Sequence, residues 1–199
     1  MAKTLLGGWW DRLRGRLQPA AFPFSQAYEL DMPGRGLVAG PKRVLGAFRL
    51  KEGERVLEVG PGTGYYSVEA ARRVGPSGRL ICMDLQPEML GEAHRRVEAA
   101  RLRADFLQAD ALALPLRSAS VDHAFLITVL GELPDRAVGL GEIRRVLRPN
   151  GRLSVSEQLP DPDFITKGTL RRELGAAGFV EESTRGGFLG YMSTWRVAS

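Results

Sequence analysis

Three glycines spaced two residues apart, directly after a short apolar run, constrain the fold of this chain more than any other feature. The run is Arg55–Val59 and the glycines are Gly60, Gly62 and Gly64. A short β-branched run that ends in glycines is typical of a buried parallel strand. Helical spacing of apolar residues over 66–74 predicts a helix after the turn. Glycines between a strand and a helix allow a tight turn and let a ligand approach the backbone.

The same unit of strand and helix recurs along the chain. We expect strands at 55–59, 79–84, 104–108, 121–128, 152–157, 178–185 and 191–197, helices at 42–48, 66–74, 87–100, 135–147 and 168–177, and a turn at 148–151. Strands that alternate with helices indicate a parallel sheet covered on both faces. The last two strands are joined by a short glycine-containing link, so they must pair antiparallel. The sequence therefore predicts an α/β fold: a doubly wound, mostly parallel seven-stranded sheet with one antiparallel strand near the C-terminus.

Composition indicates one ordinary globular domain. The chain has 199 residues, of which 44% are hydrophobic and 26% are charged. Residues 1–40 carry prolines and aromatic residues without a sustained helix or strand period, and we interpret them as an N-terminal extension or lid before a domain at 41–199. The single cysteine, Cys82, and two histidines argue against a metal cluster, so we expect no metal. His123 lies within a predicted strand and is interpreted as a core residue.

Charge and hydropathy suggest where the protein acts. No apolar run approaches the ~18 residues that a membrane span needs, and residues 1–17 contain no small-residue cleavage site. Together with the unpaired cysteine, this predicts a cytoplasmic protein without a transmembrane segment. The net charge of +5 is modest, so it permits binding to RNA without indicating it. We expect a monomer or a homodimer.

The spacing of the glycines and one nearby carboxylate narrow the ligand. A dinucleotide-binding loop has the pattern Gly-x-Gly-x-x-Gly, but here Tyr65 stands where the last glycine would be. Glu58 lies on the strand just before the loop. A carboxylate there would repel a pyrophosphate and would suit a ligand that carries a positively charged amino group.

Two aspartates follow the next two strands. Asp84 ends the second strand, where an acidic side chain can accept hydrogen bonds from both hydroxyls of a ribose. The alternative role of Asp84 is to cap the helix that begins near Pro87, and the two roles are compatible. Asp110 follows the third strand and could accept a hydrogen bond from an adenine amino group; the alternative is a solvated loop aspartate.

Together these residues resemble the Rossmann-like (class I) S-adenosylmethionine-dependent methyltransferases, over about residues 50–197. The resemblance implies that the glycine loop with Glu58 holds the methionine end of the cofactor, that Asp84 holds the ribose, and that Asp110 with Ala111 holds the adenine. The cofactor-binding residues that it implies are Glu58, Gly60, Pro61, Gly62, Gly64, Tyr65, Asp84, Leu85, Asp110, Ala111 and Thr128. Among subfamilies, the chain looks most similar to methyltransferases of small molecules, quinones and lipids.

The acceptor side is less defined. Glu132 follows the fourth strand, and Glu157 with Gln158 ends the fifth, so these three residues, together with Tyr66, are candidates for contact with a small-molecule or lipid-like substrate. Tyr65 and Tyr66 begin the helix after the glycine loop; one could flank the methionine moiety while the other lies in the core. The sequence identifies no catalytic residue, because alignment and desolvation can supply most of the rate of methyl transfer.

Three alternative functions stay open at this point. An RNA methyltransferase is compatible with the basic charge, although the base-amino Asn/Asp-Pro-Pro-aromatic motif is absent and the chain reads Thr128-Val-Leu-Gly-Glu132 there. A non-catalytic subunit that binds the cofactor for a partner is possible, because every well-matched residue binds cofactor. A nicotinamide-dependent reductase is a more distant alternative, since Tyr65 replaces the last glycine.

Overall fold

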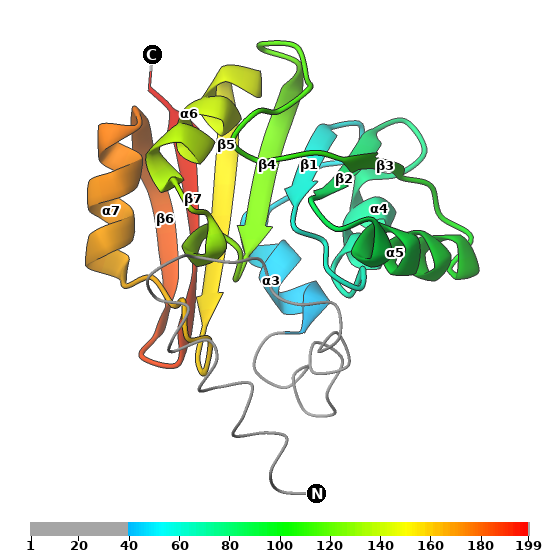
Figure 1. Ribbon diagram of the computed structural model, residues 1–199, viewed down its shortest axis with the longest axis horizontal. Helices are drawn as coiled ribbons and strands as arrows, with labels where there is room; N and C mark the ends of the chain where they lie inside the picture. Colours follow the sequence, from blue (N-terminus) through cyan, green and yellow to red (C-terminus); the bar gives the residue numbers. More distant parts are fainter. Residues whose placement is uncertain (1–39, 199) are drawn as a thin grey trace, which may run out of the picture.

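The computed structural model describes residues 40–198, which form a seven-stranded sheet flanked by helices (Figure 1). The strands are β1 (Arg55–Val59), β2 (Arg79–Asp84), β3 (Asp105–Gln108), β4 (Val121–Ile127), β5 (Leu147–Gln158), β6 (Phe179–Gly187) and β7 (Gly190–Val197). The helices are α3 (Pro41–Phe48), α4 (Ser67–Val74), α5 (Pro87–Ala99), the 3₁₀ turn η3 (Leu130–Glu132), α6 (Arg136–Val146) and α7 (Lys167–Ala176). Residues 1–40, which we interpret as an extension or lid, lie outside the described residues except for Gly40.

The order of the strands is β3-β2-β1-β4-β5-β7-β6. Strands β1 to β5 pair in parallel, whereas β7 lies between β5 and β6 and runs antiparallel to both. This arrangement confirms the predicted doubly wound sheet with one antiparallel strand. The chain reverses its direction of winding between β1 and β4, and ligands of such sheets bind at the carboxyl ends of the strands beside that point.

The predicted turn at 148–151 is wrong in one respect, because these residues are part of β5. Val121 pairs with Leu147, but His123 pairs with Arg152, so two steps along β4 are matched by five along β5. The extra residues form a bulge in which Asn150 has a φ of 63°. Asparagine tolerates this left-handed conformation better than most residues, so the turn-forming sequence is accommodated as an irregularity inside a continuous strand.

Two apolar layers hold the sheet between its helices. One face packs against α6 and α7 and includes Leu57, Leu126 and Leu153. The other face packs against α3 and α4 and includes Val56 and Phe125. Because successive side chains of a strand point to opposite faces, a sheet buried on both sides needs the continuous apolar runs that the sequence contains. None of the helices within residues 40–198 is long and apolar enough to cross a membrane.

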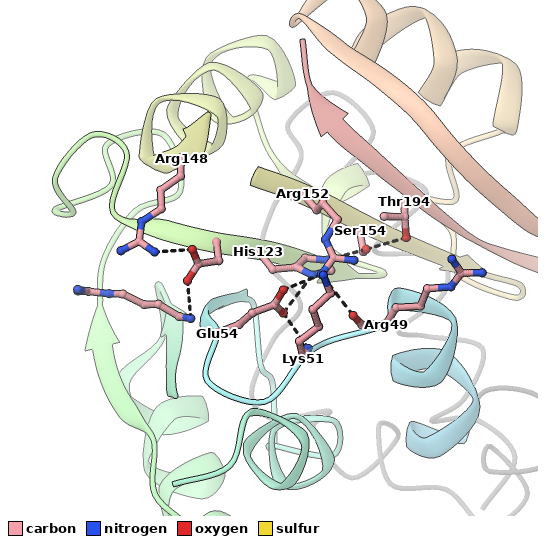
Figure 2. A network of polar contacts seen from close by, with 10 residues as sticks. Arg49, Lys51, Glu54, His123, Arg148, Arg152, Ser154 and Thr194 are labelled. Atoms are coloured by element: carbon pink, nitrogen blue, oxygen red, sulfur yellow. Dashed lines mark hydrogen bonds and ion pairs between the residues drawn. The ribbon is translucent and has the colours of Figure 1, made fainter. Parts of the chain in front are cut away.

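A polar network joins the amino ends of the central strands, which we call the amino edge (Figure 2). The Glu54 carboxylate accepts a hydrogen bond from the Arg152 guanidinium at 2.7 Å. His123, buried in β4 as expected for a core residue, is 2.8 Å through its Nε2 from the hydroxyl of Ser154, and that hydroxyl is 2.9 Å from the hydroxyl of Thr194. The network therefore links the start of β1 to strands β4, β5 and β7.

Candidate functional site

The opposite ends of the parallel strands form the carboxyl edge, which lies at the lower side of the sheet in Figure 1. The loops that leave β1, β2, β3, β4 and β5 meet here, and they carry the residues singled out from the sequence. Backbone hydrogen bonds tie these loops to their neighbours: the Gly60 N–H donates to the carbonyl of Met83 at 2.8 Å, and the Thr128 N–H donates to the carbonyl of Ser156 at 2.8 Å.

Backbone conformation and close packing both favour glycine in the loop after β1. Gly60, Gly62 and Gly64 have φ angles of 69°, 54° and 82°, a region that other residues adopt at a cost. A Cβ on Gly60 would lie 2.6 Å from Cγ2 of Val129, and a Cβ on Gly64 would lie 2.7 Å from Cα of Ala93. The loop after β1 is therefore packed against the loop after β4 and against α5. Gly60 and Gly62 are partly exposed, whereas Gly64 is buried.

Asp84 orders the same loop from the end of β2. Its carboxylate accepts hydrogen bonds from the backbone N–H groups of Gly62, Leu85 and Gln86, the last at 3.0 Å. Partial burial raises the pKa of Asp84, and these hydrogen bonds oppose the rise. The aspartate predicted to bind ribose is thus already held in position by the glycine loop. Asp84 also contacts Gln86, the residue before α5. Ordering the loop and binding a ribose are therefore compatible roles for Asp84.

The other predicted cofactor residues lie around this centre. Asp110 is exposed, and its Oδ1 accepts a hydrogen bond from the Leu112 N–H at 2.9 Å, while Ala111 beside it is buried. The exposed Leu85 side chain stands next to Asp84. Thr128, at the end of β4, has a φ of 55°, and its hydroxyl donates to the carbonyl of Ile127. Pro61 is buried within the glycine loop.

Glu58 lies behind the glycine loop. It is 2% exposed, and the Cys82 thiol donates to its Oε2 at 3.3 Å. Burial raises the pKa of Glu58 to about 7, against the opposing effects of Ser67 and Cys82. The predicted contact between Glu58 and a cofactor amino group stays a prediction, and Cys82 is the small core residue that the sequence suggested.

The two tyrosines after the glycine loop have different positions. Tyr66 is 5% exposed and belongs to the core between the sheet and α4, whereas Tyr65 is half-buried at its margin. Their rings meet edge to face at 5.1 Å. The Tyr66 hydroxyl is 3.5 Å from Nε2 of Gln158, so it reaches the end of β5. The sequence left open which of the two tyrosines lies in the core. The core residue is Tyr66, so Tyr65 remains the candidate to flank the cofactor.

Glu157 is the most deeply buried of the acceptor candidates. It is 1% exposed, one carboxylate oxygen accepts from the Ile165 N–H at 3.4 Å, and the other, Oε1, has no hydrogen-bond partner. Burial raises the pKa of Glu157 to about 8, and nearby carboxylates, Asp161 first among them, add to the rise. Glu132 is half-buried in η3 and is one of these carboxylates.

Some site residues were missed by sequence reasoning. Asp161 and Asp163 follow β5 and act on Glu157, and Val129 fills the space beside Gly60. The Asp-Pro-Asp sequence at 161–163 is visible in the chain, but its return toward β5 depends on tertiary contacts. A Cβ on Gly131 would lie 2.0 Å from the carbonyl oxygen of Asp163, so η3 and this loop are in close contact.

Comparison with known proteins agrees with this geometry. Residues 56–151 match the family described as a methyltransferase domain. A demethylmenaquinone methyltransferase from Thermus thermophilus is 38% identical over 112 residues, which is 56% of this chain and 50% of that protein. An uncharacterised 37.1 kDa protein in a transposon of Streptomyces fradiae is 38% identical over 157 residues, covering 78% of this chain and 44% of that protein. The chain thus spans about half the length of the curated relatives it matches.

One solved structure covers nearly the whole described chain. The SAM-dependent methyltransferase from Aquifex aeolicus matches with a TM-score of 0.82 and 27% identity, covering 89% of this chain and 100% of that one. The residues present here fit the same cofactor, because the glycine loop is partly exposed at Gly60 and Gly62 and the Asp84 carboxylate is held beside it. The chain belongs to the Rossmann-like (class I) S-adenosylmethionine-dependent methyltransferases.

Proposed function

We propose that this protein transfers a methyl group from S-adenosylmethionine to a small, lipid-like aromatic acceptor of the quinone type. One observation carries the proposal: Asp84, whose carboxylate accepts from the Gln86 N–H at 3.0 Å, stands at the end of β2 beside a glycine loop packed against Val129 and Ala93. The cofactor supplies a methyl group on a positively charged sulfur, which is already activated for displacement. Relatives named demethylmenaquinone methyltransferases support the class of acceptor.

Each predicted cofactor residue has a defined task in this proposal. Asp84 accepts from the ribose hydroxyls, Asp110 with Ala111 borders the adenine, and the glycine loop lies along the methionine end. Tyr65 flanks that end, while Thr128 begins the segment that separates cofactor from acceptor. The acceptor then lies over the ends of β4 and β5, beside Glu132, Glu157 and Gln158.

The alternative of an RNA acceptor has weaker support. The acceptor side of the described residues carries Glu132, Glu157, Asp161 and Asp163 close together. Such a group of carboxylates is unfavourable for a phosphate backbone, since nucleic-acid sites depend on lysine and arginine. A small neutral acceptor has no such conflict.

Label transfer tests the proposal directly. Protein is incubated with S-adenosylmethionine carrying a labelled methyl group and with either reduced demethylmenaquinone in detergent micelles or total RNA. We expect label in the quinone fraction, and none there with Asp84→Ala at cofactor concentrations that saturate the unaltered protein. Label in RNA instead, lost steeply as salt is raised, would contradict the proposed acceptor and favour the RNA alternative.

A further inference from the structure

One oxygen of the Glu157 carboxyl group is anchored and the other is free. The anchored oxygen accepts from the Ile165 N–H at 3.4 Å, while Oε1 is buried without a partner. A buried polar atom without a hydrogen bond is destabilising, so its presence in a folded protein calls for an explanation. A ligand group that completes the hydrogen bond is one such explanation.

The groups that face Glu157 from each neighbouring element are known. Glu132 faces it from η3, and Asp161 and Asp163 face it from the loop after β5. Tyr191 pairs with Glu157 across β5 and β7, but its hydroxyl donates to the carbonyl of Ile165 at 2.6 Å. The tyrosine hydroxyl therefore donates to another acceptor, and Oε1 of Glu157 has no hydrogen-bond partner within residues 40–198.

The nearby cations are also committed. Arg136 of α6 lies close enough for Glu157 to raise its pKa, but its guanidinium donates two hydrogen bonds of 2.8 Å to Glu173 of α7. The Lys167 ammonium donates to the carbonyl of Gly186 at 2.8 Å. Among residues 40–198, no ion pair neutralises Glu157, so nothing offsets the rise in its pKa that burial and the nearby carboxylates cause.

Glu157 also lies near the cofactor side of the edge. Val129 packs beside Gly60 of the cofactor loop and directly precedes η3. The same short turn carries Glu132, which acts on Glu157, and its Gly131 contacts Asp163. A single segment of four residues therefore touches the glycine loop at one end and the surroundings of Glu157 at the other.

We propose that Glu157 is the residue that accepts the proton of the methyl acceptor. The inference rests on the proposed function. The hydroxyl proton of the acceptor moves to Oε1, and the electron pair left on the acceptor forms the new bond to the methyl carbon. The bond from that carbon to sulfur breaks with its electron pair remaining on sulfur, and Glu157 later releases its proton to water. If a ring carbon is methylated, the hydrogen of that carbon leaves as a proton and the oxygen regains one.

This role defines a class of acceptor. The reacting group must be a neutral hydroxyl on an aromatic or enolic system, which keeps its proton until it meets a base. A carboxylate or phosphate at this position would meet Glu132, Asp161 and Asp163 and be repelled. A base also works best when its pKa is near the working pH, and burial among these carboxylates gives Glu157 a pKa of about 8.

Glu157→Gln tests the role, because glutamine keeps the size and removes the base. Binding of S-adenosylhomocysteine is measured by calorimetry, and turnover is measured with reduced demethylmenaquinone and with a small-molecule extract, each with labelled cofactor. We expect affinity within twofold of the unaltered protein and a kcat lower by about 100-fold or more. The matched control is Glu98→Gln, an exposed glutamate near the end of α5, which should leave both unchanged.

A second measurement needs no acceptor. The carbon-13 signal of the Glu157 carboxyl group, assigned by its loss in Glu157→Gln, should titrate with a midpoint near pH 8. Asp163→Asn removes a neighbouring charge, so it should lower that midpoint and shift the rise of kcat with pH by the same amount. A structural role alone would not move the kinetic profile.

Several results would overturn the inference. Glu157→Gln with full kcat and an unchanged pH profile would show that Glu157 is not the proton acceptor, while the proposed function would stand. A carboxyl midpoint near 4.5 would exclude the environment that the role requires. Unaltered protein that binds S-adenosylhomocysteine but methylates neither the quinone nor the extract would overturn the acceptor assignment and the role of Glu157 together. Absence of binding would refute the proposed function itself.

Discussion

Within the described part of the chain, acidic side chains are paired with arginines at one edge of the sheet and lack cationic partners at the other. At the amino edge two carboxylates pair with arginines: Glu54 pairs with Arg152 (Figure 2), and Asp122 pairs with Arg148. At the carboxyl edge, the buried Glu58 and Glu157 have no arginine or lysine partner among the described residues.

This difference separates stability from function. The charge of a paired carboxylate is balanced by its arginine partner, so it requires no ligand. A buried carboxylate without a cation has a raised pKa and lowers stability when it ionises, so such groups are concentrated at functional sites. The ion pairs of the amino edge therefore help to hold the strands together, whereas the buried carboxylates of the carboxyl edge are candidates for contact with a ligand.

The largest expected effect is an opposite pH dependence of stability at the two edges. Burial raises the pKa of Glu157 to about 8 from an ordinary value of 4.5. The folded protein therefore binds a proton that the unfolded chain has lost, and stability falls as pH rises from about 4.5 through 8. Glu157→Gln should remove this loss, on the order of 4 kcal/mol between pH 5 and pH 9, measured by urea unfolding.

His123 should show the reverse at the amino edge. Burial lowers its pKa, so below about pH 6.5 the unfolded chain takes up a proton that folded His123 does not. Stability therefore falls as pH decreases below about 6.5, and His123→Gln should flatten the acid side of the profile. If both variants changed stability on the same side of the pH profile, the contrast between the two edges would be wrong.

Asp84→Ala should weaken binding of S-adenosylhomocysteine by about 2–4 kcal/mol, because two hydrogen bonds to a charged acceptor are lost. Calorimetry would register this as a roughly 30-fold to several-hundred-fold rise in Kd. The matched control is Asp122→Ala at the amino edge, which should leave Kd unchanged. A folded Asp84→Ala protein with unaltered affinity would reduce Asp84 to a residue that orders its loop.

Arg152→Met addresses the amino edge alone. It removes the partner of Glu54, and the two side chains are 15% and 13% exposed, so the carboxylate would be left largely buried and unpaired. We expect a loss of about 2 kcal/mol in the free energy of unfolding, less than for a fully buried pair. The Kd for S-adenosylhomocysteine should stay within twofold. A large change in Kd with little change in stability would show that the two edges are coupled.

Asp110→Asn should have the smallest effect. An amide oxygen can still accept a hydrogen bond from an adenine amino group, and Asp110 is exposed to solvent. The expected loss of affinity is below about 1 kcal/mol and smaller than that of Asp84→Ala. The ranking of the two variants in one calorimetric series checks this placement of the adenine, and the reverse ranking would contradict it.

The sequence predicted the sheet well because local patterns determine it. Apolar runs, helical spacing and glycine turns identified seven strands, and the short link before β7 fixed its antiparallel direction. The segment at 148–151 was misassigned, since only pairing with β4 shows that Asn150 lies in a bulge. Local turn chemistry and a long strand can coexist, and tertiary pairing decides between them.

The site was predicted in part for the same reason. Residues that follow strands had to meet at one edge, so the glycines, Asp84 and Asp110 could be located from the chain. The free oxygen of Glu157 and the pairing of Arg136 with Glu173 depend on contacts between elements distant in sequence. No local pattern indicates which buried carboxylate lacks a partner.

Calorimetry with S-adenosylhomocysteine and NAD on the unaltered protein tests the central claim most directly. The glycine spacing, the loop packed against Val129 and the position of Asp84 predict that S-adenosylhomocysteine binds and NAD does not. Tight binding of NAD with no response to S-adenosylhomocysteine would contradict the assignment of the carboxyl edge.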